Sequence, residues 1–202
     1  MLDLILIGGG GHCKSVIDVV EQTKRFNIVG IVEKLGSKIQ KVSGYDVIGN
    51  DDDLSELLKS TPQALVTIGQ IKSCHARMFA YQVASSLGAQ LPSVISPYSY
   101  VSSQSQIGSG TVVMHDAIIN SCATVGENVI LNSKCLVEHD VKIGDHCHIS
   151  TGALINGDVM IEDGCFIGSG VVLRNGIKVG ANSVIGMGSI VSTDVVSGSF
   201  IR

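Results

Sequence analysis

The chain has 202 residues, a net charge of −4 at pH 7 and no run of lysine or arginine, which excludes a protein that binds nucleic acid or an anionic membrane by electrostatic attraction. Its apolar start, MLDLILIGGGG, lacks the basic region of a signal peptide, and no stretch is long enough to span a bilayer. The six cysteines show no CxxC spacing, so we expect a reduced, cytoplasmic protein in which disulfides play no part.

The first part of the chain, residues 1–94, alternates strand-like and helix-like segments. Apolar runs that end in glycine indicate buried strands, and apolar residues at helical spacing, such as Val16, Val19 and Val20, indicate helices. An asparagine or aspartate can cap the second helix, and Gly88 can end the third. The expected order is strand 2–8, helix 12–24, strand 27–33, helix 50–60, strand 63–69 and helix 71–88. This βαβαβα order predicts an α/β domain with a small Rossmann-like parallel sheet covered by helices.

Residues 95–202 follow a six-residue period instead. From Ile95 to Val191, all 17 positions that lie six apart are aliphatic, without an insertion. Glycine is abundant, at 24 residues, and aromatic residues make up only 4% of the chain, so aliphatic side chains must form a thin, repetitive core. A period of six is typical of a parallel β-helix, whose coils stack at the spacing of neighbouring strands.

The repeat and two motifs together resemble a known family. The motifs are LILIGGGGHCKSVIDVVE at the start and VEHDVKIGDHCHISTGA within the repeat. With them the chain is similar, over nearly its whole length, to the PglD/NeuD-like sugar acetyltransferases, in which three hexapeptides form each coil of a left-handed β-helix. The resemblance implies a homotrimer that transfers acetyl from acetyl-CoA to the amino group of a nucleotide-linked amino sugar for surface glycan synthesis. The alternatives are O-acetylation of sialic acid or another sugar hydroxyl, a metal-dependent hydratase and a non-catalytic β-helix.

The glycine-rich segment IGGGGH joins the first strand to the first helix, where backbone N–H groups and the helix dipole can hold phosphate. It is an incomplete dinucleotide motif, because Cys13 or Lys14 stands where the third glycine is needed, and a simple tight turn is the alternative. The resemblance favours binding. It implies that five residues face the nucleotide sugar: Gly10, Gly11, His12, Glu33 and Lys34. Of these, the glutamate would contact the base or ribose, where the family usually has aspartate.

Three histidines, His139, His146 and His148, fall within ten residues. They could be metal ligands, as in β-helical enzymes with a zinc site, solvent-facing residues, or members of an acyl-transfer site. The resemblance to the metal-dependent β-helices is limited to the repeat, so we expect no metal. We expect His146 to face solvent, as does His75 on the third helix.

Stacking gives acyl transfer a geometric basis at His139. Residues 18 apart lie in successive coils, so Gly157 lies above His139, where it leaves space for a thioester and exposes an N–H that can stabilise an oxyanion. Glu138 and Asp140 flank the histidine, and either can orient its ring. The resemblance implies that His139 is the general base, Asp140 its acidic partner and Gly157 the amide donor.

The resemblance implies further contacts. Asn132 and Glu138 would contact the acceptor substrate. His148 would be a second active-site histidine and, because it lies half a coil from His139, would serve a cleft shared with a neighbouring subunit. The acetyl-CoA site would comprise His148, Gly157, Gly168, Ser169, Met187 and Gly188. For the last four the alternative is ordinary coil residues. The chain ends at SGSFIR and lacks the Gly-x-Pro-Ala segment that family members often have near the coenzyme.

The cysteines of the repeat invite a catalytic interpretation that their positions do not favour. Cys135, Cys147 and Cys165 each occupy the fourth position after a repeat aliphatic, which points inward. Cys147 and Cys165 are one coil apart and are expected to stack. We therefore predict that all three pack in the core.

Overall fold

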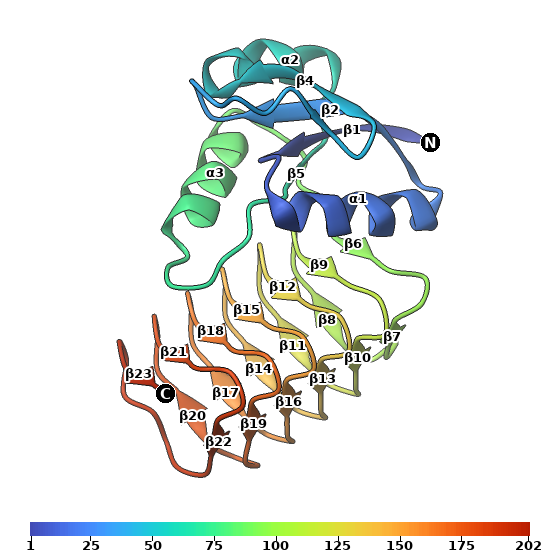
Figure 1. The fold of residues 1–202 in the computed structure, drawn as a ribbon. Coiled ribbons are helices and arrows are strands. Elements are labelled where there is room, and N and C mark those ends of the chain that lie inside the picture. The colour runs from blue at the N-terminus through green and yellow to red at the C-terminus, as the bar shows by residue number, and fades with distance from the viewer.

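The computed structural model describes residues 1–202 and consists of an α/β domain that lies across one side of a β-helix (Figure 1). The N-terminal sheet has the strand order β3-β4-β2-β1-β5. Its strands are β1 (Leu2–Ile7), β2 (Phe26–Glu33), β3 (Lys41–Val42), β4 (Tyr45–Asn50) and β5 (Ala64–Val66). β1 pairs in parallel with both β2 and β5, so the predicted α/β fold is confirmed.

Three helices accompany this sheet: α1 (Gly11–Thr23), α2 (Leu54–Ser60) and α3 (His75–Ser86). α1 forms because its apolar residues recur at helical spacing, and Val16, Val19 and Val20 are fully buried. A 3-10 turn at Asp51–Asp53 leads into α2. A capping box closes the start of this turn: the Asn50 side chain accepts from the Asp52 N–H, and the Asp53 carboxylate accepts from the Asn50 N–H. None of the helices is long and apolar enough to cross a lipid bilayer.

Two details differ from the predicted elements. Residues 71–74 form a loop, and the third helix begins only at His75, although Gly88 follows its end with the expected positive φ, of 81°. An antiparallel hairpin, β3-β4, adds an edge to the sheet, and its turn has positive φ at Ser43 and Gly44. The prediction missed this hairpin because β3 has only two residues, too few to show alternation, and aspartate, glycine and asparagine interrupt the apolar residues of β4, YDVIGN.

The β-helix consists of two-residue strands that form three parallel sheets. The domain-facing sheet, which carries the N-terminal domain, contains β6 (Val94–Ile95), β9 (Val112–Val113), β12 (Ile130–Leu131), β15 (His148–Ile149), β18 (Phe166–Ile167), β21 (Val184–Ile185) and β23 (Phe200–Ile201). The apolar-faced sheet contains β7 (Tyr100–Val101), β10 (Ile118–Ile119), β13 (Leu136–Val137), β16 (Leu154–Ile155), β19 (Val172–Leu173) and β22 (Ile190–Val191). The polar-faced sheet contains β8 (Gln106–Ile107), β11 (Thr124–Val125), β14 (Lys142–Ile143), β17 (Met160–Ile161) and β20 (Lys178–Val179).

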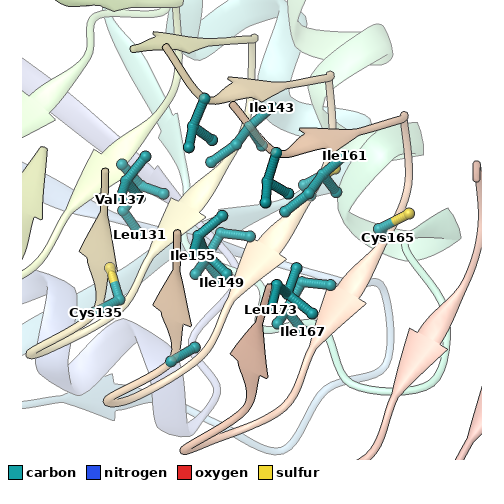
Figure 2. Packing of buried hydrophobic residues seen from close by; sticks show 14 of the residues in the cluster. Leu131, Cys135, Val137, Ile143, Ile149, Ile155, Ile161, Cys165, Ile167 and Leu173 are labelled. Atoms are coloured by element: carbon teal, nitrogen blue, oxygen red, sulfur yellow. The ribbon is translucent and has the colours of Figure 1, made fainter. Parts of the chain in front are cut away.

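Neighbouring strands pair residues that are 18 apart, for example Ile118 with Leu136, except β21 and β23 in the last coil, which pair residues 16 apart. Three hexapeptides therefore form one coil of the left-handed β-helix, as predicted. The second residue of each strand points inward and forms the core, as Ile149 and Ile155 do (Figure 2). Three cysteines, Cys135, Cys147 and Cys165, are buried in the same core, which confirms their predicted packing role. Burial raises the pKa of the Cys135 thiol to about 12, so its reactive thiolate is strongly disfavoured.

The two domains share a buried interface centred on Arg77 of α3, whose side chain is 1% exposed. Its guanidinium donates to the carbonyl oxygens of Val66 (2.7 Å) and Ile68 (3.0 Å) in the N-terminal domain. It also donates to those of Asn128 (3.1 Å) and Gly110 (3.5 Å) in the β-helix. One buried cation therefore joins backbone groups of both domains and sets their relative position.

Candidate active site

His139 lies in the turn between β13 and β14, at the edge where the apolar-faced and polar-faced sheets meet. Its Nδ1 lies 2.9 Å from Oδ2 of Asp140. A carboxylate only accepts hydrogen bonds, so Nδ1 carries the proton and Nε2 presents a lone pair. The hydrogen bond to Asp140 raises the pKa of His139, whose side chain is 60% exposed. This pair has the chemistry of an oriented general base.

Gly157 lies one coil beyond His139, and because it has no side chain the imidazole can lie against it. A Cβ at this glycine would lie 2.7 Å from Nε2 of His139, far inside van der Waals contact. The Gly157 N–H donates to no group of the chain. On the other side, Oε2 of Glu138 accepts from Nδ2 of Asn120 at 2.9 Å. A ring nitrogen with a lone pair and a backbone amide without an acceptor thus lie close together, as acyl transfer from a thioester requires.

His148 stands on β15 of the domain-facing sheet and is buried beneath the N-terminal domain, so it faces another side of the coil than His139, as its spacing predicts. Its Nδ1 lies 2.6 Å from the carbonyl oxygen of Gln70 and must donate to it. Its Nε2 therefore accepts from Nδ2 of Asn132, at 3.1 Å. Burial lowers the pKa of His148 to about 4. The residue is a neutral imidazole that orients the Asn132 amide.

His12, in the first turn of α1, lies beside His148, with 6.5 Å between the ring centroids. Burial, aided by the positive charge of Arg77, lowers the pKa of His12 to about 3. Its Nε2 is buried without a hydrogen-bond partner. A cavity of about 320 Å³ adjoins this pair and is lined by Gln70 and Phe166, and the Phe166 ring lies 5.2 Å from that of His148. Two neutral imidazoles thus lie together where the domains meet.

The glycine loop leads directly into α1, and Gly10 is the N-cap of that helix without a capping side chain. The space around a Cβ of Gly10 or Gly11 is empty, so a ligand can approach the backbone there. Glu33 is buried and accepts a hydrogen bond from the Gly9 N–H. The loop is therefore held by the carboxylate that is expected to contact the base or ribose. Glu33 and Lys34 also line a second cavity of about 270 Å³ beside β4.

The residues expected on the acetyl-CoA path lie in turns that join the domain-facing sheet to the apolar-faced sheet. Gly168 follows β18 and Met187 follows β21, one coil further on. A Cβ at Gly168 would lie 2.6 Å from the Met187 N, so only glycine fits between these coils. Ser169 bonds to Ser150 through their hydroxyls at 2.9 Å, Gly188 has a φ of 72°, and the Met187 side chain is 83% exposed. These turns and His139 flank opposite edges of the apolar-faced sheet.

His146 is half-buried and packs against the N-terminal domain, so the prediction that it only faces solvent is corrected. Its Nδ1 lies 3.0 Å from Nδ2 of Asn128, and its ring meets the edge of the Tyr81 ring of α3 at 5.6 Å. Burial lowers the pKa of His146. It is part of the domain interface, whereas His75 is exposed as predicted. No group of three or more histidine, cysteine, aspartate or glutamate side chains is arranged to hold a metal ion.

Sequence reasoning also missed a Ser-His-Asp chain between the domains. Nδ1 of His115 lies 2.6 Å from Oγ of Ser96, and its Nε2 lies 2.9 Å from Oδ2 of Asp18 on α1. Ser96 is only 1% exposed, so no substrate reaches its hydroxyl. These two hydrogen bonds join α1 to the first coils of the β-helix. The three residues lie too far apart in the sequence for any motif to reveal them.

Comparison with known proteins agrees with both halves of the chain. Residues 3–78 match the PglD N-terminal domain, and residues 122–157 and 158–193 match the six-repeat bacterial transferase hexapeptide family. No curated protein matches the sequence.

Two solved structures are similar over almost the whole chain. The acetyltransferase domain of PglB from Neisseria gonorrhoeae, in complex with acetyl-CoA, is 30% identical, with 98% of this chain and 94% of that chain covered and a TM-score of 0.86. PerB from Caulobacter crescentus, in complex with CoA and GDP-perosamine, is 27% identical, with 98% and 92% covered and a TM-score of 0.89. By its fold, its two sequence families and its identity to the PglB domain, the chain belongs to the PglD/NeuD-like sugar acetyltransferases.

Proposed function

We propose that the protein transfers the acetyl group of acetyl-CoA to the amino group of a nucleotide-linked amino sugar, a reaction that serves surface glycan synthesis. The observation that carries this proposal is the His139–Asp140 pair, whose imidazole Nε2 lies beside Gly157. The similar PglB domain holds acetyl-CoA and the similar PerB holds CoA with GDP-perosamine, which supports the same two classes of substrate here.

The reaction proceeds by direct transfer. The sugar amine attacks the thioester carbonyl carbon as Nε2 of His139 takes the amine proton, and a C–N bond forms. The Gly157 N–H donates to the oxygen that becomes negatively charged. When the C–S bond breaks, His139 returns the proton to the CoA thiolate. Asp140 holds the ring in the correct tautomer throughout and stabilises the transient imidazolium, because its carboxylate accepts from Nδ1.

The nucleotide diphosphate binds at the start of α1. Gly10, Gly11 and His12 have backbone N–H groups that donate to no group of the chain, and the helix dipole favours an anion there. Lys34 adds a positive charge near the second cavity, and Glu33 orients the loop through Gly9. The acceptor sugar then lies near His12 and Asn132. Acetyl-CoA runs along the turns that carry Gly168 and Met187.

The active enzyme is a homotrimer. The outward residues of the apolar-faced sheet are all apolar, and they are Tyr100, Ile118, Leu136, Leu154, Val172 and Ile190. Four of these are between 39% and 80% exposed in the single chain. Such a continuous apolar surface marks an interface. Association through this sheet brings the His139 edge of one subunit to the coenzyme edge of the next, which completes the site.

Replacing Leu154 by Arg tests the trimer. We expect the variant to sediment as a monomer and to lose activity, because a charge is buried in the interface. Met160→Arg is the matched control, since Met160 is 41% exposed on the polar-faced sheet and Leu154 is 39% exposed. A trimeric, active Leu154→Arg variant would show that this surface is not the interface.

A free-thiol assay with acetyl-CoA and a panel of nucleotide-linked amino sugars tests the reaction, and His139→Ala tests the site. We expect turnover to fall by roughly 10²–10⁴-fold without the base, with acetyl-CoA binding little changed. Gln82→Ala is the control, because Gln82 is exposed on α3 and lines neither cavity. Near-normal turnover by His139→Ala would remove the proposed mechanism, and acetylation of a sugar hydroxyl alone would identify the other acceptor class.

A further inference from the structure

Asn175 occupies the position equivalent to His139 and Gly157 in the next coil, since the three residues are 18 apart along the same edge of the β-helix. The position that a Cβ of Gly157 would take lies 2.7 Å from Nε2 of His139 and 3.3 Å from Nδ2 of Asn175. Both nitrogens therefore lie close to Gly157, one from the coil before it and one from the coil after it. No side chain stands at this position to shield either nitrogen from a substrate.

The amide of Asn175 differs from every other asparagine of the β-helix in having no partner. Four of the others bond through their amide nitrogen to groups of the chain, and Oδ1 of Asn182 accepts from the Cys74 thiol. Asn175 is exposed and forms no hydrogen bond within the chain. A donor that serves no structural contact, beside a catalytic base, is available to a substrate.

We propose that Asn175 is a further catalytic residue, the second hydrogen-bond donor to the thioester carbonyl oxygen, beside the Gly157 N–H. This inference rests on the proposed acetyl transfer. Two donors suit the chemistry, because the carbonyl oxygen gains a full negative charge when the amine nitrogen bonds to the carbonyl carbon. The electron pair on this oxygen then forms the C=O bond again as the C–S bond breaks and the CoA thiolate leaves. Donation by Asn175 therefore strengthens most in the transition state and should act on kcat.

Three variants test the proposal. Asn175→Ala removes the donor, and Asn175→Asp keeps the shape but replaces the donor by a carboxylate that repels the oxyanion. Thr193→Ala is the matched control, because Thr193 is exposed and lies one coil further along the same edge. We expect Asn175→Ala to lower kcat by about 10- to 100-fold, Asn175→Asp to lower it further, and the control to match the wild type. The Kd of CoA, which lacks the acetyl group, should stay within about twofold in the alanine variant.

An infrared measurement with acetyl-CoA labelled by ¹³C at the thioester carbonyl needs no acceptor sugar. A donated hydrogen bond lowers the carbonyl stretching frequency of the bound thioester, and part of that shift should be lost in Asn175→Ala but kept in Thr193→Ala. Wild-type kcat and an unchanged frequency in Asn175→Ala would overturn the inference and leave the proposed function intact. A raised KM with unchanged kcat would also overturn it. Wild-type protein that neither binds nor uses acetyl-CoA would remove both proposals.

Discussion

The space between His139 and Gly157 gives a sharp prediction for Gly157→Ala. The added Cβ would lie 2.7 Å from both Nε2 and Cε1 of His139, whereas ordinary contact begins at 3.4 Å, so the ring must retreat by about 0.7 Å. Displacement of a reacting group by about 1 Å can cost roughly 100-fold in rate. We expect kcat to fall by about 10- to 100-fold. Thermal stability should change little, because the His139 side chain is exposed and can swing outward.

The double variant His139→Ala/Gly157→Ala isolates the cause. If the alanine methyl acts only by displacing the imidazole, it adds almost no loss once the imidazole is absent, and the two effects are strongly non-additive. The assay is the steady-state release of CoA thiol, with melting temperature as the folding control. Wild-type kcat in Gly157→Ala would refute the placement of His139 beside this glycine. Full additivity in the double variant would show that the methyl group acts elsewhere, for instance on the thioester itself.

Three further predictions follow from the charges of the structure. Asp140→Asn should lower the pKa of His139, because the carboxylate that stabilises the imidazolium is lost. The rising limb of the kcat/KM against pH profile, which reports formation of the neutral imidazole, should therefore move to lower pH, and the plateau should be reduced. An unmoved limb would exclude Asp140 as the hydrogen-bond partner of His139. Arg77→Met should lower the free energy of unfolding by about 3–5 kcal/mol, measured by urea denaturation, because it leaves four carbonyl oxygens, three of them in buried hydrogen bonds, without their donor. A loss under about 1 kcal/mol would contradict this role. Stability should fall below about pH 6.5, since an unfolded histidine binds a proton there, while His12 and His148 stay neutral to about pH 3 and 4. His148→Gln should make that fall shallower, and a variant with the wild-type slope would argue against a neutral buried His148.

Much of the fold could be predicted because its determinants are local. The period of six fixes which side chain points inward, so the buried ladder from Val113 to Val191 and the inward cysteines follow from spacing alone. The same spacing of 18 residues brings Gly157 beside His139 without any knowledge of the N-terminal domain. The hairpin β3-β4 escaped prediction because so short a strand carries no period.

The proposed catalytic pair, His139 and Asp140, could be predicted from neighbouring residues, but the position of the free donor beside it could not. Asn175 lies on the same 18-residue ladder as His139, yet its position alone does not reveal that its amide turns toward Gly157 and bonds to nothing in the chain. That depends on the rotamer which the stacked coils permit.

The two architectures, the inward core and the stacking of His139 and Gly157 follow from the order of the amino acids, because each contact recurs at a set separation along the chain. How the domains meet depends on the folded structure. The His148–Gln70 hydrogen bond joins residues 78 apart, and Arg77 reaches Asn128 across 51 residues. The packing of the two domains also places His146 against Tyr81. No period links such residues, since their contact depends on the shapes and hydrogen-bonding groups of two surfaces that exist only after each domain has folded.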